Sequence, residues 1–484
     1  MDALDLARWQ FAITTVYHFW FVPVTIGMSA IVAGFHTAYL RTRDPRLLKM
    51  TKFLGKLFII NFALGLVTGI VQEFQFGMNW SEYSRFVGDI FGAPLAFEAL
   101  LAFFLESVFI GLWLFGWGKL PEKLHASCMW LVHIGTVLSA YFILAANSFM
   151  QNPVGYRYNP ETKRAELTDF VAVLFNKVQL VTFPHVITAA YMTGGAMVMA
   201  VCLWHLRRGK AGELTTTYRQ AVRAGAIVTL VASLGVIVSG DIQGKIMTEV
   251  QPMKMAAAEA HYNTSSHAPF SVLSVGNLSG TQAVHLIEIP GLLSYLGKGD
   301  FNAEIQGIYD LQKEYQEKFS GNPLTADPVS NYTPYIPATY WTFRLMIGAG
   351  FAAMFTALLA LWATRKKAMA GDGPAAVMRA RWWHWLIVAA PLLPIAANSF
   401  GWIFTEIGRQ PWVVNHLMVT RVGVSPSVSA TEVAISLVVY TLVYAAAAVV
   451  EVKLFVRYIR RGAEAETEPD PREHDDDAPL VAAY

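Results

Sequence analysis

Apolar runs of about twenty residues recur along nearly the whole chain, separated by shorter polar stretches. A helical run of this length is long enough to cross the ~30 Å hydrocarbon core of a bilayer. The pattern therefore predicts an all-α integral membrane protein, a bundle of about nine transmembrane helices. We expect the spans near residues 12–38, 53–76, 94–117, 127–149, 184–206, 221–240, 338–362, 384–405 and 430–456.

The composition supports one membrane domain rather than several soluble ones. Of the 484 residues, 54% are hydrophobic and 15% are charged, whereas roughly 25% are charged in an average soluble domain. The formal net charge of +2 gives no indication of nucleic-acid binding. The two cysteines, Cys128 and Cys202, have no partners at metal-ligand spacing, which makes a disulfide framework or a thiolate metal site unlikely on sequence grounds.

Basic residues cluster after alternate spans, and cytoplasmic loops carry the excess of Lys and Arg in membrane proteins. This pattern predicts that the N-terminus lies outside and the C-terminus lies in the cytoplasm. Residues 1–462 form the expected membrane domain, with 241–337 as a long extracytoplasmic loop that contains a short helix. Residues 463–484 are acidic and poor in apolar side chains, so we expect a disordered cytoplasmic tail. The basic clusters lie within 41–52, 119–123, 207–219, 365–381 and 457–461.

Several ionisable side chains fall inside the predicted spans, where they are costly and are functional candidates. The predicted topology places His18, Glu98, His185 and Glu406 toward the outer leaflet, together with Met346. Imidazole, carboxylate and thioether groups at one depth on different helices can supply axial ligands to haem iron. The alternative is structural: a single histidine can be a hydrogen-bonded core group, and a single methionine usually only packs.

Two further pairs of charged residues have candidate roles. Glu98 and Glu106 are separated by about two helical turns, roughly 12 Å of rise and some 80° around the axis. They could form a proton ladder, or they could line a polar helix interface. Arg344 and Arg409 lie close in sequence to Met346 and Glu406. Each guanidinium could bind a haem propionate, or could extend toward the lipid headgroups.

Five sequence runs carry a family resemblance that covers nearly the whole chain except the acidic tail. They resemble subunit I of the cytochrome bd-type quinol oxidases, in the form with a short outer loop. The run at 401–412 is highly specific. The runs are 8–23 (RWQFAITTVYHFWFVP), 147–155 (NSFMQNPVG), 251–259 (QPMKMAAAE), 343–346 (FRLM) and 401–412 (GWIFTEIGRQPW).

The resemblance implies three cofactors: a low-spin haem b, a high-spin haem b and haem d. It implies that His185 and Met346 ligate the low-spin haem, and that His18 and Glu406 ligate the two high-spin haems. It does not assign either of these two ligands to a particular high-spin haem. The remaining implied residues are Glu98 and Glu106 for proton entry, Lys254 and Glu259 for quinol, and Trp402, Arg344 and Arg409 around the haems.

The resemblance further implies a multi-pass protein of the bacterial plasma membrane that oxidises membrane quinol and reduces dioxygen to water. A proton gradient would arise because quinol releases protons outside while protons for water come from the cytoplasm, without pumping. The expected partners are subunit II and small accessory subunits. The quinone type, ubiquinol or menaquinol, stays open.

Two other classes of protein compete with this interpretation. One is a proton-coupled transporter, which would show no haem absorbance, and the other is a cytochrome b carrier, which needs no further high-spin sites.

Overall fold

The computed structural model describes residues 2–209, 211–327, 331–365 and 377–466. Within this part of the chain, nine helical segments are long and apolar enough to cross a membrane, which confirms the predicted number. Most of their ends extend beyond the predicted spans, but the third segment ends two residues before the predicted limit of 117 and the ninth begins at the predicted residue 430. The nine segments are α1 (Ala3–Thr42), α2 (Pro45–Met78), Ser81–Phe115, α5 (Glu122–Gln151), α7 (Lys177–Arg208), η2 with α8 (Gly212–Leu214 and Thr215–Val250), α12 (Ile336–Ala363), α14 (Trp382–Ile407) and α15 (Ala430–Arg461).

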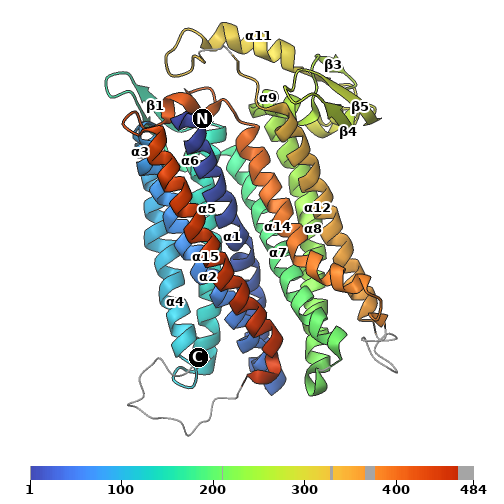
Figure 1. Ribbon diagram of the computed structural model, residues 1–484. Coiled ribbons are helices and arrows are strands. Elements are labelled where there is room, and N and C mark those ends of the chain that lie inside the picture. Colours follow the sequence, from blue (N-terminus) through green and yellow to red (C-terminus); the bar gives the residue numbers. More distant parts are fainter. Residues whose placement is uncertain (1, 210, 328–330, 366–376, 467–484) are drawn as a thin grey trace.

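Local sequence signals explain several helix ends. The Asp2 side chain accepts from the amide of Asp5 and caps α1. Asp44 caps α2 and is followed by Pro45, whose fixed φ suits the first helical position. At α15, the Ser429 hydroxyl and the Glu432 carboxylate form a reciprocal capping box. Short polar turns of this kind allow successive long helices to run antiparallel (Figure 1).

The third span is not a uniform α-helix. It consists of α3 (Ser81–Phe97), a π-helical segment η1 (Glu98–Phe103) and α4 (Phe104–Phe115). A π segment turns less per residue than an α-helix, and such segments are frequent at functional sites. The separation of 80° expected between Glu98 and Glu106 assumed a continuous α-helix, so that expected angle was wrong. The π segment rotates the two carboxylates toward one face.

Glycines bring the main chains of three helices into contact. A Cβ on Gly27 of α1 would lie 2.3 Å from the carbonyl oxygen of Ala190, and one on Gly194 of α7 would lie 2.5 Å from the Gly27 α-carbon. Gly195 of α7 meets α8 in the same way, because its Cβ would lie 2.7 Å from the Gly225 oxygen. Small residues allow helix backbones to approach closely in membranes, where close packing replaces the hydrophobic effect. Helices α1, α7 and α8 therefore form a tightly packed centre of the bundle.

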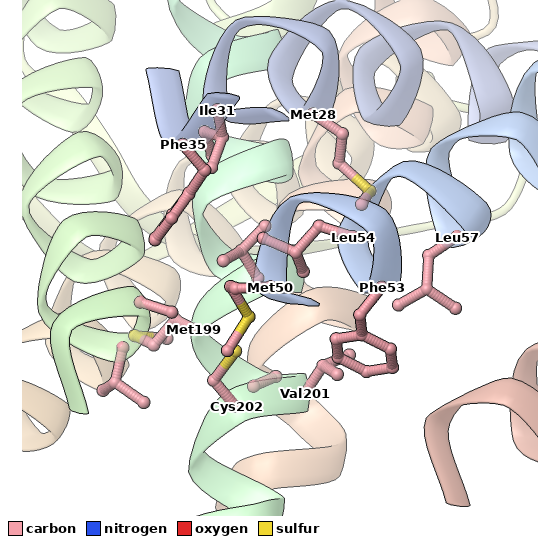
Figure 2. Packing of buried hydrophobic residues seen from close by; sticks show 14 of the residues in the cluster. Met28, Ile31, Phe35, Met50, Phe53, Leu54, Leu57, Met199, Val201 and Cys202 are labelled. Atoms are coloured by element: carbon pink, nitrogen blue, oxygen red, sulfur yellow. The ribbon is translucent and has the colours of Figure 1, made fainter. Parts of the chain in front are cut away.

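The largest apolar cluster lies in the half of the bundle away from the N-terminus. It joins α1, α2 and α7 through fully buried side chains such as Met28, Met50, Phe53 and Cys202 (Figure 2). Cys128 and Cys202 are both buried free thiols. Both cysteines therefore serve as packing residues, and neither forms a disulfide.

The chain between α8 and α12 forms a small subdomain over one end of the bundle, the end that also holds the N-terminus (Figure 1). Helix α8 continues to Val250, so residues 241–250 of the expected loop are helical and the subdomain itself begins after Val250. The expected short helix is α9 (Pro252–Glu259). The subdomain also contains β3 (Ser265–Ser266) paired with β6 (Glu304–Ile305), the antiparallel hairpin β4 (Phe270–Gly276) and β5 (Ala283–Ile289), α10 (Leu292–Lys298) and α11 (Ile308–Phe319). We call this end of the bundle the loop end.

Shorter elements complete the loop end. They are the hairpin β1 (Tyr156–Asn159) and β2 (Arg164–Leu167), α6 (Phe170–Leu174), the pair β7 (Trp412–Val414) and β8 (Met418–Val419), and η4 (Thr420–Gly423). At the opposite end, Glu464 in η5 (Ala463–Ala465) accepts a 2.8 Å hydrogen bond from Tyr218, and Lys56 pairs with Glu466 at 2.8 Å. The first residues of the predicted tail are thus packed against α2 and α8. Residues 467–484 of that tail lie outside the described residues.

Candidate haem, proton and quinol sites

His18 and His185 lie at equal height on two parallel helices. Each precedes by nine residues the glycine at which α1 and α7 touch, Gly27 and Gly194 respectively. Nine residues correspond to roughly 14 Å along a helix and to about two and a half turns, which puts the two positions on opposite sides of the helix. Each histidine therefore lies on the side of its helix away from the crossing. His18 contacts α2 and His185 contacts α8, so the two imidazoles belong to separate sites.

A hydroxyl group orients each imidazole in the same way. His18 Nδ1 is 3.0 Å from Thr68 Oγ1, and His185 Nδ1 is 3.0 Å from Ser239 Oγ. Both hydroxyls already donate to helix carbonyls, of Leu64 and of Gly235, so each accepts from the Nδ1 proton. That assignment leaves the Nε2 lone pair of both histidines for another partner. Fixing the tautomer through the opposite ring nitrogen is typical of histidines that ligate metals.

A third candidate ligand, Met346 of α12, faces a gap in side chains on α14. A Cβ on Gly401 would lie 3.0 Å from the Met346 sulfur. The glycine thus gives the thioether room that any larger residue would take. Nearby, Trp402 stacks on Phe19 of α1 with ring centroids 4.3 Å apart and planes within 3°. This stack connects the sequence run 401–412, at the end of α14, to the helix that carries His18.

Glu406, which is partly exposed, and the buried Arg409 form an ion pair at the loop end of α14, and Asn147 donates to Glu406 across 3.2 Å. The Arg409 side chain is 2% exposed, yet its Nε and Nη1 have no hydrogen-bond partner. Burying unpaired charged donors is costly, so this guanidinium fits a site that receives an anionic group. A haem carboxylate has that chemistry.

The two carboxylates of the third span both face α5. Glu98 accepts a 2.7 Å hydrogen bond from Ser139. Glu106 packs against Gly135, where a Cβ would lie 2.6 Å from the Glu106 Cγ. Glu106 is 7% exposed, and its Oε1 has no partner. Since Gly135 and Ser139 are one turn apart on α5, the structure places both carboxylates along one line between the same two helices.

Lys254 of α9 is buried directly above α14. Its ammonium group lies 3.5 Å from the Gln151 side-chain oxygen and 5.3 Å from the centre of the Phe404 ring. A Cβ on Gly408 would lie 3.0 Å from the Lys254 Cγ. Burial lowers the pKa of Lys254 to about 7, and the Arg409 charge adds to this, while Glu406 opposes it. A lysine that loses its proton near neutral pH is suited to proton exchange.

Glu259, at the end of α9, forms a buried ion pair with Arg344 of α12 across 2.6 Å. Ser271 donates its backbone N–H to the same carboxylate oxygen at 3.1 Å, and the other oxygen has no partner. Burial raises the pKa of Glu259 to about 7, although Arg344 and the Ser271 N–H lower it. Lys254 and Glu259 are 3% and 2% exposed, so they do not form a solvated face.

The sequence did not reveal all partners of these residues. The Arg344 guanidinium also donates to the carbonyl oxygens of Ala258 and Ser271. Its observed partners thus belong to the Glu259 site, and its predicted contact with a haem propionate stays a prediction. Thr68 and Ser239, which fix the histidine tautomers, had no sequence signal, because they lie 50 and 54 residues from the histidines they contact.

These features define a class: a polytopic helical membrane protein whose imidazole, thioether and carboxylate groups are buried or partly buried and are of the kinds that can ligate haem iron and transfer protons. Among the described residues, no group of three or more His, Cys, Asp or Glu side chains is placed to hold a metal ion by itself. A haem iron needs only one or two protein ligands, which the separated histidines can supply. Comparison with known proteins then gives the family.

Residues 6–463 match the family model of cytochrome bd terminal oxidase subunit I, and the chain belongs to that family. It is 45% identical to cytochrome bd ubiquinol oxidase subunit 1 of Bacillus subtilis, over 97% of this chain and 96% of the relative. It is 35% identical to cytochrome bd-II ubiquinol oxidase subunit 1 of Escherichia coli, over 97% and 99%. The family oxidises quinol and reduces oxygen, so this chain is an enzyme subunit, a quinol:oxygen oxidoreductase.

The fold matches as well. The solved structure of the bd oxidase from Geobacillus thermodenitrificans superposes with a TM-score of 0.82 at 26% identity, covering 95% of this chain and 99% of the other. This likeness confirms the all-helical architecture over nearly the full length. Family membership also implies haem cofactors, a multi-pass membrane location and pairing with a second subunit.

Proposed function

We propose that the subunit generates a proton gradient by vectorial chemistry. Quinol is oxidised at the loop end, its protons leave on the outer side, and protons for water enter from the cytoplasm along α4 and α5. The observation that carries the proposal is the matched pair of histidines, at equal height with Nε2 unused, below a buried site of titratable residues. No pumping element is required.

His185 and Met346 would hold a low-spin haem b, and His18 and Glu406 would hold a high-spin haem b and haem d. Bound haem supplies one-electron transfer and oxygen chemistry. The orphaned donors of Arg409 support propionate binding, and the Trp402–Phe19 stack supplies an aromatic wall near His18. Arg344 holds Glu259 in place and can additionally meet a propionate.

At the quinol site, Glu259 is the group that accepts a proton from the quinol hydroxyl. Its unpartnered oxygen is available to that hydroxyl, while Arg344 and the Ser271 N–H fix the other oxygen. Lys254 lies on the same short helix and near Glu406 and Arg409, so it couples the quinol site electrostatically to the α14 site. The loss of two protons and two electrons converts quinol to quinone, and bound haem would supply the acceptor for the electrons.

On the inner side, Glu106 and Glu98 transfer protons toward the oxygen site. Glu106 lies deeper and is almost fully buried, and the π segment brings Glu98 onto the same line facing α5. A buried carboxylate with an unpartnered oxygen can take up and release a proton where a structural one would be fully hydrogen-bonded.

The orientation follows from charge. The described basic residues near the turns after α1, α4 and α7 lie at the end opposite the loop subdomain (Figure 1). By the positive-inside rule, we place that end in the cytoplasm of a bacterium and the loop end outside the plasma membrane.

Subunit II is the expected partner. Apolar side chains such as Leu100 and Leu442, which are 67% and 64% exposed, mark faces for lipid or that subunit.

A reduced-minus-oxidised visible spectrum of the purified complex tests the proposal most directly. We expect one low-spin and two high-spin haem signals, together with quinol-dependent oxygen uptake. External acidification by right-side-out vesicles, with alkalinisation inside, would support the vectorial mechanism. A complex with fewer haem signals, or without external acidification, would contradict the proposal.

A further inference from the structure

The hairpin β4–β5 carries a buried cluster of hydroxyl and imidazole groups beside Glu259. Ser274 Oγ lies 2.5 Å from His285 Nδ1, and Ser271 Oγ lies 3.3 Å from the same nitrogen. The two serine hydroxyls also hydrogen-bond each other, and Ser271 Oγ lies 2.9 Å from the Tyr340 hydroxyl. Four side chains that can pass protons are thus joined in one network.

An irregularity in the strand produces this cluster. Side chains alternate between the two faces of a regular strand, so Ser271 and Ser274 would point to opposite sides. The pairing of β4 with β5 is interrupted on both sides of Leu273, which is where a bulge re-aims a side chain. As a result Ser271 and Ser274 are both buried, 1% and 3% exposed, and Ser274 sits directly across from His285.

The network runs from the protein interior to the surface. At its inner end, Ser271 donates its backbone N–H to the Glu259 carboxylate, which is 2% exposed. At its outer end, the His285 side chain is 27% exposed and lies 3.7 Å from the Glu288 carboxylate, which is 36% exposed. His261 is the other titratable group that interacts with His285. Burial isolates the inner end from water, while the outer end can exchange protons with it.

We propose that His285 is the outer proton acceptor for quinol oxidation, reached from Glu259 through the hydroxyls of Ser271 and Ser274. The proposal rests on the function assigned above to Glu259 and deepens it. A proton taken from quinol by Glu259 moves to the Ser271 hydroxyl, which passes its own proton through Ser274 to His285 and then to water. Bound haem would accept the electrons separately from this proton route.

One step in this route is not spanned by a hydrogen bond. The Glu259 carboxylate reaches Ser271 through the backbone amide, whereas the relay continues from the hydroxyl of the same residue. The proposal assigns this step to rotation of the Glu259 carboxyl group. Rotation would bring the unpartnered Oε1 of Glu259 toward the Ser271 hydroxyl and exchange the pairing of Oε2 with Arg344.

The experiment compares His285→Asn with His267→Asn in the purified complex. His267 is another histidine of the loop subdomain, hydrogen-bonded to the Phe301 carbonyl and outside the network. For His285→Asn we expect quinol turnover to fall roughly 100-fold, the low end for a positioned proton-transfer group. Oxygen uptake driven by ascorbate and a mediator should stay unchanged. Added imidazole should restore quinol turnover, and His267→Asn should match the parent in all three assays.

For His285→Asn, two results would overturn the relay: parental quinol turnover, or a loss that imidazole does not restore, which indicates a structural role. Ser274→Ala is the second variant. It removes the connecting hydroxyl but leaves His285, and it should lower quinol turnover with haem spectra intact. Full turnover in Ser274→Ala would also contradict the route. Failure of the parent complex to oxidise quinol would instead refute the underlying function, so the two failures are distinguishable.

Discussion

The Met346 sulfur lies against the bare α-carbon of Gly401, so that a Cβ there would sit 3.0 Å from Sδ. Replacing Met346 with Leu keeps the side-chain volume but removes the sulfur. We expect the low-spin haem signal to disappear or change while the high-spin signals remain, as read from reduced-minus-oxidised spectra. Met354→Leu, two turns further along α12, is the control. An unchanged low-spin spectrum and potential would refute the ligand assignment.

The same contact predicts a milder effect from Gly401→Ala. The added methyl group would lie closer to the Met346 sulfur than an ordinary van der Waals contact and would displace this flexible side chain. The reduction potential of the low-spin haem should therefore shift without loss of the haem. Gly348→Ala on α12 is the matched control, because a Cβ there meets nothing within 4 Å. A redox titration distinguishes the two variants. If Gly401→Ala and Gly348→Ala have the same low-spin reduction potential, the position of the sulfur does not matter to the haem.

Glu259→Gln should slow quinol oxidation while leaving the haem spectra and mediator-driven oxygen uptake intact. Glutamine keeps the size of the side chain and can still accept from Arg344, but it cannot take a proton from quinol. The expected loss of turnover is about 100-fold or more. Glu317→Gln, at an exposed position of α11, should behave as the parent. Equal quinol turnover in Glu259→Gln and the parent would contradict the assignment.

The pH dependence of quinol oxidation should show the same residue. Burial raises the pKa of Glu259 to about 7, and the carboxylate can accept a proton only when ionised. Quinol turnover should therefore increase as pH rises through about 7, a limb that mediator-driven uptake lacks. The limb should be absent from the residual activity of Glu259→Gln. A profile that stays flat from pH 6 to 8 in the parent would contradict this role.

Glu106→Gln tests the inner proton route. It preserves size and hydrogen bonding but cannot release a proton, and we expect turnover to fall by roughly 100-fold or more. Electrons should still enter from quinol, so the haems should stay reduced during turnover. Glu98→Gln should additionally alter the high-spin spectra, because Glu98 is expected beside those haems. Full oxygen reduction with normal cytoplasmic proton uptake in Glu106→Gln would favour a structural polar interface.

Hydropathy alone predicted the nine spans, because the length of an apolar helix is set by the thickness of the bilayer. It underestimated the helix ends, since it detects only the part that faces lipid: α8 continues past the predicted limit of 240 to Val250. The π segment at Glu98 was also not predictable, because it depends on packing against α5 rather than on local propensity.

The sequence named the candidate site residues one by one, but it did not predict the hydrogen bonds and ion pairs between them. Sequence placed Arg344 near Met346, whereas its ion pair with Glu259 joins residues 85 positions apart. The network of Ser271, Ser274 and His285 was missed because its geometry depends on a bulge in β4. Such contacts arise from tertiary packing, for which a single sequence carries little signal.

The glycine contact between α1 and α7 has a consequence for electron flow. Redox centres exchange electrons at a rate that falls steeply with their separation, so a respiratory subunit benefits from a fixed spacing between donor and acceptor. Here two main chains meet at Gly27 and Gly194, nine residues from His18 and His185. With His18 and His185 as the proposed haem ligands, the backbone contact rather than mobile side chains would set the tunnelling distance, and a bulkier residue at either glycine should change the rate of the enzyme without touching a proposed ligand.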